Sequence, residues 1–314
     1  MSTRILNLPF LSNFRSSETS AAPSKPVTEL PQNPLDRFES APNRLWRRMF
    51  TPVGRSQSQQ ILPQNDLASL YTRLGNLNRE SGVEVKTLGS VDDLPIHLIE
   101  MRGTSSAAKK NVLICAGVHG NEPSGVSAVF ELISELRTKP HLGENFNFYI
   151  LPCVNPHGFK AGERRNPKDV DLNRAFAIDG GQPEAEIAVV KPFMEKMSFD
   201  LVLDLHSALP KRNGYFVLHR SDLDLLKPAM QNFAQDWPVL SNGSKPYKEE
   251  APGICTSKPK GTLKDYLAES GCPHVVTLEA PRAMEFNQRV RGLSRLAGSI
   301  VDQFALLNGV KETS

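Results

Sequence analysis

Between residues 64 and 308 the sequence alternates short apolar runs with amphipathic segments, and this alternation is what most constrains the fold. Residues 111–118 (NVLICAGV) form a near-continuous apolar run, which is typical of a strand buried within a parallel sheet. The segment that follows carries Val126, Phe130 and Ile133 at spacings of four and three, which favours a helix with one apolar face. Strands that alternate with helices predict an α/β fold with a central mixed, largely parallel sheet flanked by helices.

The same criteria predict the remaining elements along the chain. We expect strands at 83–88, 95–101, 111–118, 146–154, 200–205, 214–219 and 274–279, and helices at 65–80, around 126–136, 184–197, 222–235, 263–270 and 286–306. No internal repeat interrupts this order, so residues 64–314 are expected to form a single domain.

The first 63 residues differ from this pattern. They contain 8 of the 24 prolines, many Ser, Asn and Gln residues, and 8 Lys or Arg against 4 Asp or Glu. Such a composition buries little apolar surface, so we expect a flexible, basic N-terminal segment over 1–63. Its apolar stretch is broken, whereas a secretory signal needs a longer uninterrupted one, which argues against such a signal.

Composition also excludes several classes of protein. The formal net charge of the whole chain is only +3, which argues against a nucleic-acid partner. No apolar run reaches the ~18 residues that a membrane span needs. The four cysteines show no CxxC spacing, so we interpret them as free thiols in a reducing compartment and expect a cytoplasmic protein.

Polar side chains with metal-binding chemistry follow three of the predicted strands. His119 and Glu122 come directly after residues 111–118, His206 follows 200–205, and Glu279 ends 274–279. Because sites in open α/β sheets form beyond the carboxyl ends of the strands, we expect these side chains to meet at one edge of the sheet.

Two histidines and one glutamate are the protein ligands of a catalytic zinc that keeps a fourth position open for water. The HxxE spacing of His119 and Glu122 is weak evidence alone, since a loop histidine explains it equally well. A hydrolytic centre also needs a base that is not a ligand, and Glu279 fits that requirement.

Further motifs lie between these residues: NPHGF at 155–159, ERRNPKDVDLNRAF at 163–176, and LEAP at 278–281. In this order and spacing, the chain resembles the zinc carboxypeptidases of the M14 family over about 64–308. It is especially similar to the compact branch that includes murein peptide amidases and succinylglutamate desuccinylase/aspartoacylase-like proteins. The resemblance implies a zinc carboxypeptidase-like fold with one Zn²⁺ per chain, held by His119, Glu122 and His206.

The resemblance also implies roles for other residues. Glu279 would be the general base and then the general acid. Arg164 would polarise the scissile carbonyl, with Arg165 as the competing candidate. Asn173 and Arg174 would bind the terminal carboxylate of the substrate, a task that suits an arginine fork. Asp171 would orient one of the zinc-binding histidines.

One position departs from the family pattern. Pancreatic-type members carry a mobile tyrosine where this chain has Thr256, and neither Tyr247 nor Tyr266 can be assigned in its place. How the substrate is enclosed therefore stays open.

The sequence therefore predicts a zinc-dependent metallohydrolase, of carboxypeptidase or murein-peptide amidase type, that cleaves an amide bond adjacent to a free carboxylate. Its substrate would be a peptide or an N-acyl amino acid, so an N-acyl amino acid deacylase is the alternative. A catalytically silent peptide-binding module is a second alternative, which the sequence supports less.

Overall fold

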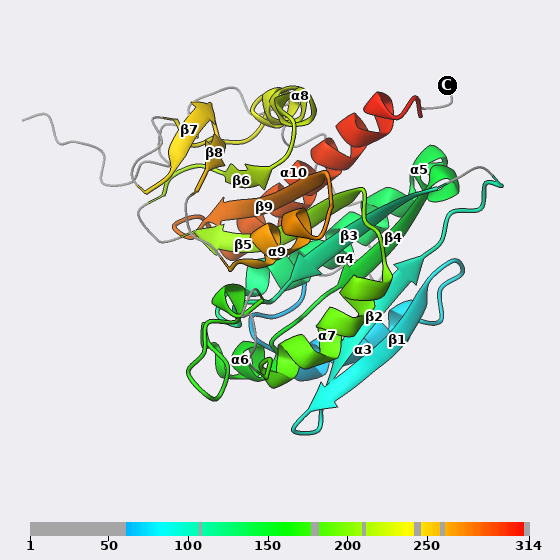
Figure 1. The fold of residues 1–314 in the computed structure, drawn as a ribbon, viewed down its shortest axis with the longest axis vertical. Helices are drawn as coiled ribbons and strands as arrows, with labels where there is room; N and C mark the ends of the chain where they lie inside the picture. The colour runs from blue at the N-terminus through cyan, green and yellow to red at the C-terminus, as the bar shows by residue number, and fades with distance from the viewer. Residues whose placement is uncertain are drawn as a thin grey trace, which may run out of the picture. The chain divides into compact units, whose positions relative to one another are not determined.

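The computed structural model describes residues 61–106, 109–176, 182–208, 212–241, 246–257 and 261–310 (Figure 1). Almost all of the segment expected to be flexible, residues 1–60, lies outside the described residues. Within the described part, Leu62 is buried against the core, so the folded region includes the residues just before 64.

A nine-stranded sheet forms the centre of the fold, in the order β1-β2-β4-β3-β5-β9-β6-β8-β7. Its strands are β1 (Glu84–Val91), β2 (Leu94–Met101), β3 (Lys110–Ala116), β4 (Phe146–Leu151), β5 (Leu201–Ala208), β6 (Phe216–Arg220), β7 (Lys248–Ala251), β8 (Ile254–Thr256) and β9 (His274–Pro281). The central strands β4, β3, β5 and β9 run parallel. Antiparallel pairs flank them, β1 with β2 and β2 with β4 on one side, and β9 with β6 on the other. The expected mixed, largely parallel sheet is confirmed.

Helices cover both faces of the sheet (Figure 1). Apolar side chains of α3 (Leu67–Leu77), α4 (Pro123–Arg137), α8 (Leu223–Phe233) and α10 (Phe286–Leu307) belong to one buried cluster. Those of α7 (Ala185–Lys196) and α9 (Leu263–Glu269) belong to a second. Side chains alternate between the two faces of a strand, so β3 contributes Val112 and Ile114 to the first cluster and Leu113 and Cys115 to the second.

Helix α3 shows how local sequence defines an element. Its four leucines are buried at spacings of three and four, and the Asp66 side chain accepts a hydrogen bond from the Ser69 backbone N–H at the helix N-terminus. The structure ends this helix at Leu77, within the range predicted at 65–80. The four cysteines are all buried and free.

Several short elements were not predicted. They are α5 (Pro140–Asn145), α6 (Pro156–Ala161), the 3₁₀ turn η2 (Leu172–Arg174) and the edge strands β7 and β8. Strand β7 reads KEEA, a sequence without the alternating apolar pattern of a strand, and pairs antiparallel with β8. Helix α6 did carry a local signal, since Asn155 caps it and Pro156 occupies its first turn. None of the helices in the described ranges is both long and apolar enough to cross a membrane. The cytoplasmic location stays a prediction.

Candidate functional site

The polar residues that end the strands do meet at one edge of the sheet. Strand β3 ends at Ala116, and the turn after it carries His119 and Glu122, the latter directly before α4. His206 lies in β5, the neighbour of β3, and is the aligned partner of Glu279 in β9. Aligned residues on adjacent parallel strands project to the same face, so these strands bring the side chains together from distant parts of the chain.

His119, Glu122 and His206 form a compact, buried cluster. The two Nδ1 atoms of the histidines lie 3.0 Å apart. Glu122 Oε1 lies 3.1 Å from His119 Nδ1, and Glu122 Oε2 lies 2.9 Å from His206 Nδ1. All three side chains are about 3% exposed, and one ligand atom from each lies within 4.8 Å of the others. Two imidazole nitrogens and a carboxylate converging in this way fit a divalent transition metal.

The other nitrogen of each histidine ring is held by a carboxylate. His119 Nε2 lies 2.9 Å from Asp171 Oδ1, and His206 Nε2 lies 2.8 Å from Asp204 Oδ2. A carboxylate on one nitrogen fixes the proton there and leaves the lone pair of the other nitrogen for a metal. Both Nδ1 atoms therefore face the cluster as potential ligands.

Asp204 was missed in the sequence. The signal was present, because Asp204 stands two residues before His206 on the same strand, and residues i and i+2 share a face. Asp171, which the resemblance assigned to this task, contacts His119 from the segment before η2.

Charges within the cluster shift its pKa values. Burial would lower the pKa of His206, but Asp204 and Glu122 hold it well above its usual range. Burial would raise the pKa of Glu122, yet His206 and His119 hold it well below. The Ser207 backbone N–H also donates to Glu122 Oε2 at 2.8 Å. Glu122 is therefore held as a carboxylate, the form that binds a cation.

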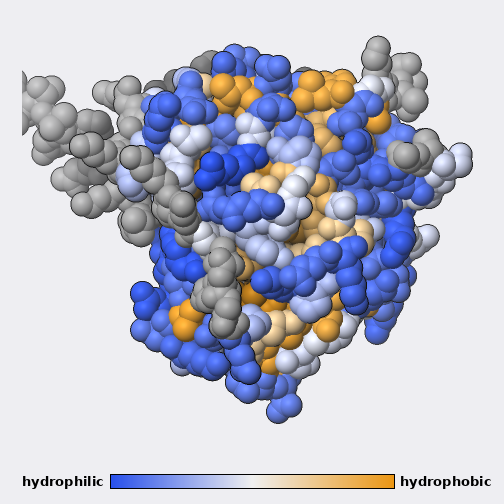
Figure 2. Space-filling view, in the orientation of Figure 1, coloured by the Kyte–Doolittle hydropathy of each residue, from blue (hydrophilic) through white to orange (hydrophobic). Residues whose placement is uncertain are grey.

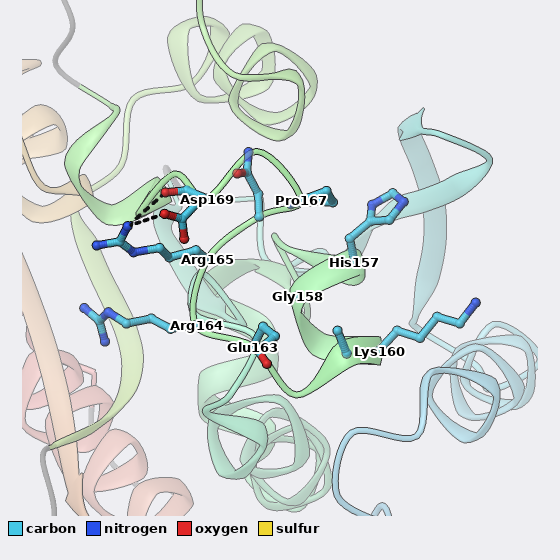
Figure 3. Close-up of a pocket in the computed structure, with 10 residues that line it drawn as sticks. His157, Gly158, Lys160, Glu163, Arg164, Arg165, Pro167 and Asp169 are labelled. Atoms are coloured by element: carbon cyan, nitrogen blue, oxygen red, sulfur yellow. Dashed lines mark hydrogen bonds and ion pairs between the residues drawn. The ribbon is translucent and has the colours of Figure 1, made fainter.

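The structure separates the two adjacent arginines. Arg164 donates from Nη1 to Glu122 Oε1 at 3.2 Å and from Nη2 to Asp171 Oδ2 at 3.1 Å, so its guanidinium lies beside the cluster. Arg165 instead donates to Asp169 at the surface, at 3.0 Å. Figure 3 shows Arg165 joined to Asp169 while Arg164 extends without contacting the other residues drawn. Of the two, Arg164 is the one near the candidate metal ligands.

A surface pocket of about 850 Å³ lies next to Arg164, lined by α6 and the segment after it. His157, Lys160 and Arg165 lie around it, together with Glu163 and Asp169 (Figure 3). The face of the molecule seen in Figure 1 is mainly hydrophilic, with apolar side chains visible between hydrophilic ridges (Figure 2). The pocket thus lies beside Arg164 and is not lined by the three candidate ligands.

Asn173 and Arg174 lie in η2, directly after Asp171. The Asn173 side-chain oxygen accepts a hydrogen bond from the Leu263 backbone N–H at 3.0 Å, at the start of α9. This contact fixes the amide and leaves its NH₂ group as the part available to an acceptor. Arg174 is exposed and donates to the Asn173 carbonyl oxygen at 2.7 Å. The pair presents hydrogen-bond donors, as binding of a carboxylate requires.

Glu279 has an unusual environment. Its Oε2 atom is buried without a hydrogen-bond partner among the described residues. Burial raises the pKa of Glu279 to about 8; His206 opposes this effect, and the charges of Glu122 and Asp204 add to it. A carboxyl group with an elevated pKa near the cluster can both accept and donate a proton near neutral pH.

Two further residues lie at the site although no sequence motif predicted them there. Arg282, three residues after Glu279, donates from Nη2 to Asn121 Oδ1 at 3.4 Å and to Glu122 Oε1 at 3.5 Å. The ring of Tyr247 packs on Phe216 and under Arg212, and its pKa is raised by burial and by the charge of Glu279. Tyr247 thus lies near the site although it does not align with the family's tyrosine.

Comparison with known proteins agrees with this geometry. The sequence model of the succinylglutamate desuccinylase/aspartoacylase catalytic domain matches residues 108–293, more than half of the chain. The chain belongs to this family. The matched stretch contains all the candidate site residues, from His119 to Glu279.

Individual proteins similar to this member of the desuccinylase/aspartoacylase family align with shorter stretches of its sequence. Murein peptide amidase A of Escherichia coli K12 is 42% identical over 72 residues, which is 23% of this chain and 27% of that protein. The N-alpha-acetyl-L-2,4-diaminobutyric acid deacetylase of Halomonas elongata is 34% identical over 117 residues, 36% of this chain and 32% of that protein. The aligned stretches span about a third or less of these two relatives.

Among solved structures, the metallo-carboxypeptidase of Burkholderia cenocepacia superposes with a TM-score of 0.59 at 20% identity. The match covers 74% of this chain and 68% of that one. At this identity the likeness shows the fold, which is the expected carboxypeptidase-like one.

Proposed function

We propose that this protein is a zinc-dependent hydrolase that cleaves an amide bond adjacent to a free carboxylate. The observation that carries the proposal is the buried cluster of His119, Glu122 and His206, in which both Nδ1 atoms and the carboxylate converge while other carboxylates hold the outer ring nitrogens. When bound there, zinc supplies a Lewis acid that polarises a water molecule and the carbonyl of the substrate.

The chain's own residues perform the remaining steps. Glu279 accepts the proton of the attacking water and then delivers it to the departing amine. Its raised pKa suits both directions of transfer, because the carboxylate of a strongly acidic group would be too weak a base to take a proton from the attacking water.

Arg164 stabilises the negative charge that develops on the carbonyl oxygen. Its contacts with Glu122 and Asp171 fix the guanidinium at the site before the reaction, so that little reorganisation is needed. Asn173 and Arg174 bind the carboxylate next to the scissile amide and so place that bond at the reacting centre.

Two kinds of substrate satisfy this arrangement. The similarity to murein peptide amidase A supports a peptide. The matched family and the similarity to a deacetylase support an N-acyl amino acid. In both substrates a free carboxylate lies beside the amide, and they differ in what occupies the acyl side.

A test combines metal analysis with a substrate panel. The purified chain should contain about one zinc per protein molecule and should hydrolyse either peptides or N-acyl amino acids from a mixed pool. His206→Ala serves as the metal-free control. A chain that binds zinc but hydrolyses neither class would instead be a silent binding module.

A further inference from the structure

Asn65 contacts the turn that carries the metal ligands. It lies directly before the N-terminal Asp66 of α3, with a backbone φ of 55°, in the left-handed region that asparagine tolerates better than most residues. Its side-chain NH₂ donates to two carbonyl oxygens, that of Gly120 at 2.8 Å and that of Phe159 at 2.7 Å. One amide therefore joins the start of α3, the ligand turn and α6.

The contact is made at a point of that turn where there is no room for a side chain. Gly120 stands between the ligands His119 and Glu122, and a Cβ atom placed there would come within 1.9 Å of the Gly158 backbone in α6. The Gly120 N–H donates to the Arg164 carbonyl oxygen at 3.4 Å. The turn is thus packed against α6, and the Asn65 amide holds the Gly120 carbonyl.

This arrangement matters because the backbone of a glycine can adopt a wider range of conformations than that of any other residue. Without a Cβ atom, Gly120 can rotate through backbone angles that other residues avoid. A rotation there would move the imidazole of His119 relative to the carboxylate of Glu122. Within the turn, the Glu122 N–H donates to the His119 carbonyl oxygen at 3.2 Å. Hydrogen bonds from outside the turn add a second restraint on the relative position of the two ligands.

We propose that Asn65 is a positioning residue that holds the Gly120 carbonyl so that His119 and Glu122 bind one metal ion. The inference rests on the proposed metal centre. The inference predicts that loss of the Asn65 amide weakens metal binding. Residues that contact and orient metal ligands commonly change metal affinity by about 10–100-fold when they are mutated.

Two variants of the full-length chain separate the amide from the backbone. Asn65→Gly keeps the left-handed φ at no steric cost and removes the side chain. Asn65→Asp keeps the shape, but a carboxylate cannot donate and would face two carbonyl oxygens. We expect both variants to bind zinc about 10–100-fold more weakly than the wild type, with the lower affinity in Asn65→Asp. Competition with a chelator measures these affinities.

Asn147→Ala is the matched control. Asn147 is also a partly buried amide that joins separate segments, through contacts with Asn111 and Gly103 at 2.9 and 3.0 Å, and it lies at the other end of β4. This variant should lose stability in urea without a change in zinc affinity. The visible spectrum of bound Co²⁺ should change in the Asn65 variants and not in Asn147→Ala, because it reports ligand geometry.

Each outcome decides the matter. Zinc affinities within threefold of wild type in both Asn65 variants, with an unchanged Co²⁺ spectrum, would overturn the inference and leave the proposed function intact. A wild-type chain that binds no more metal than His206→Ala would overturn the proposed function and this inference together.

Discussion

His206 and Glu279 are aligned partners on the adjacent parallel strands β5 and β9, although 72 residues separate them in the sequence. The pairing places a candidate metal ligand and the Glu279 carboxyl group on the same face of the sheet. The buried Oε2 atom of that carboxyl group has no hydrogen-bond partner among the described residues. The proposed base is therefore positioned by two hydrogen-bonded strands in the central part of the sheet.

Loss of His206 should remove the metal. His206→Ala leaves only two protein ligands, so the purified variant should contain little zinc by elemental analysis. His219→Ala is the control, because His219 is also buried but pairs with Glu250 outside the cluster. Full zinc retention by His206→Ala would contradict the ligand assignment.

Glu279→Gln should keep the fold and the metal while losing turnover. The amide has nearly the shape of the carboxyl group but cannot take up a proton, so kcat should fall by about 10²–10⁴-fold. Glu100→Gln, which changes a buried carboxylate paired with Arg102 on β2, should leave kcat unchanged. A near-normal kcat in Glu279→Gln would mean that another group is the base.

The terminal carboxylate of the substrate should be required. Converting it to an amide should lower kcat/KM by about 10²-fold, because Arg174 loses a charge-assisted partner. Arg174→Ala should show a similar loss with the free acid, and the two losses should not add, since they remove one interaction. Equal cleavage of amidated and free-acid substrates would contradict both the carboxypeptidase-type and the deacylase proposals.

Residues 1–60 should be dispensable for the chemistry. All the proposed catalytic and binding residues lie between 119 and 279, and Asn65 is retained in a chain that begins at residue 61. The fragment 61–314 should therefore match the full chain in kcat/KM and in zinc content. A sharp rise in activity would instead identify the N-terminal segment as inhibitory.

The buried pair of Lys264 and Asp265 in α9 should make stability depend on pH. Burial would raise the pKa of Asp265, but Lys264 at 2.9 Å and the Thr262 hydroxyl hold it below its usual value of 3.8. A lowered pKa in the folded state means that the stabilisation is present above about pH 4 and is lost as the pH falls further.

Comparison with Asp265→Asn tests this pH dependence. Near neutral pH the variant should be less stable by about 3 kcal/mol, because it leaves the buried ammonium group of Lys264 without a full counter-charge. The difference in unfolding free energy, measured with urea from pH 7 to pH 3, should shrink below about pH 4, because the unfolded wild-type chain takes up a proton at Asp265 more readily than the folded one. A constant difference would show that folding does not lower the pKa of Asp265.

The sequence alone determined the fold class and the positions of the main elements, because apolar periodicity is a local property. The near-continuous apolar run at 111–118 and the leucine spacing of 65–80 predicted strand β3 and helix α3, and both are present. The order of motifs also identified the family and the candidate ligands. The residue types of the candidate ligands and their positions after predicted strands can be identified from the linear sequence, without knowing which strands pair.

Only the tertiary structure decided which of two adjacent residues faces the site. The sequence favoured Arg164 by its spacing from Asn173 but left Arg165 as a competing candidate, and the path of the loop turns Arg164 toward Glu122 and Arg165 toward Asp169. The same holds for Arg282 and Asn65, which reach the ligand turn from distant segments and belong to no motif. Periodicity specifies which face of its own element a residue occupies, whereas contacts between segments depend on how the sheet pairs and how the loops cross its edge.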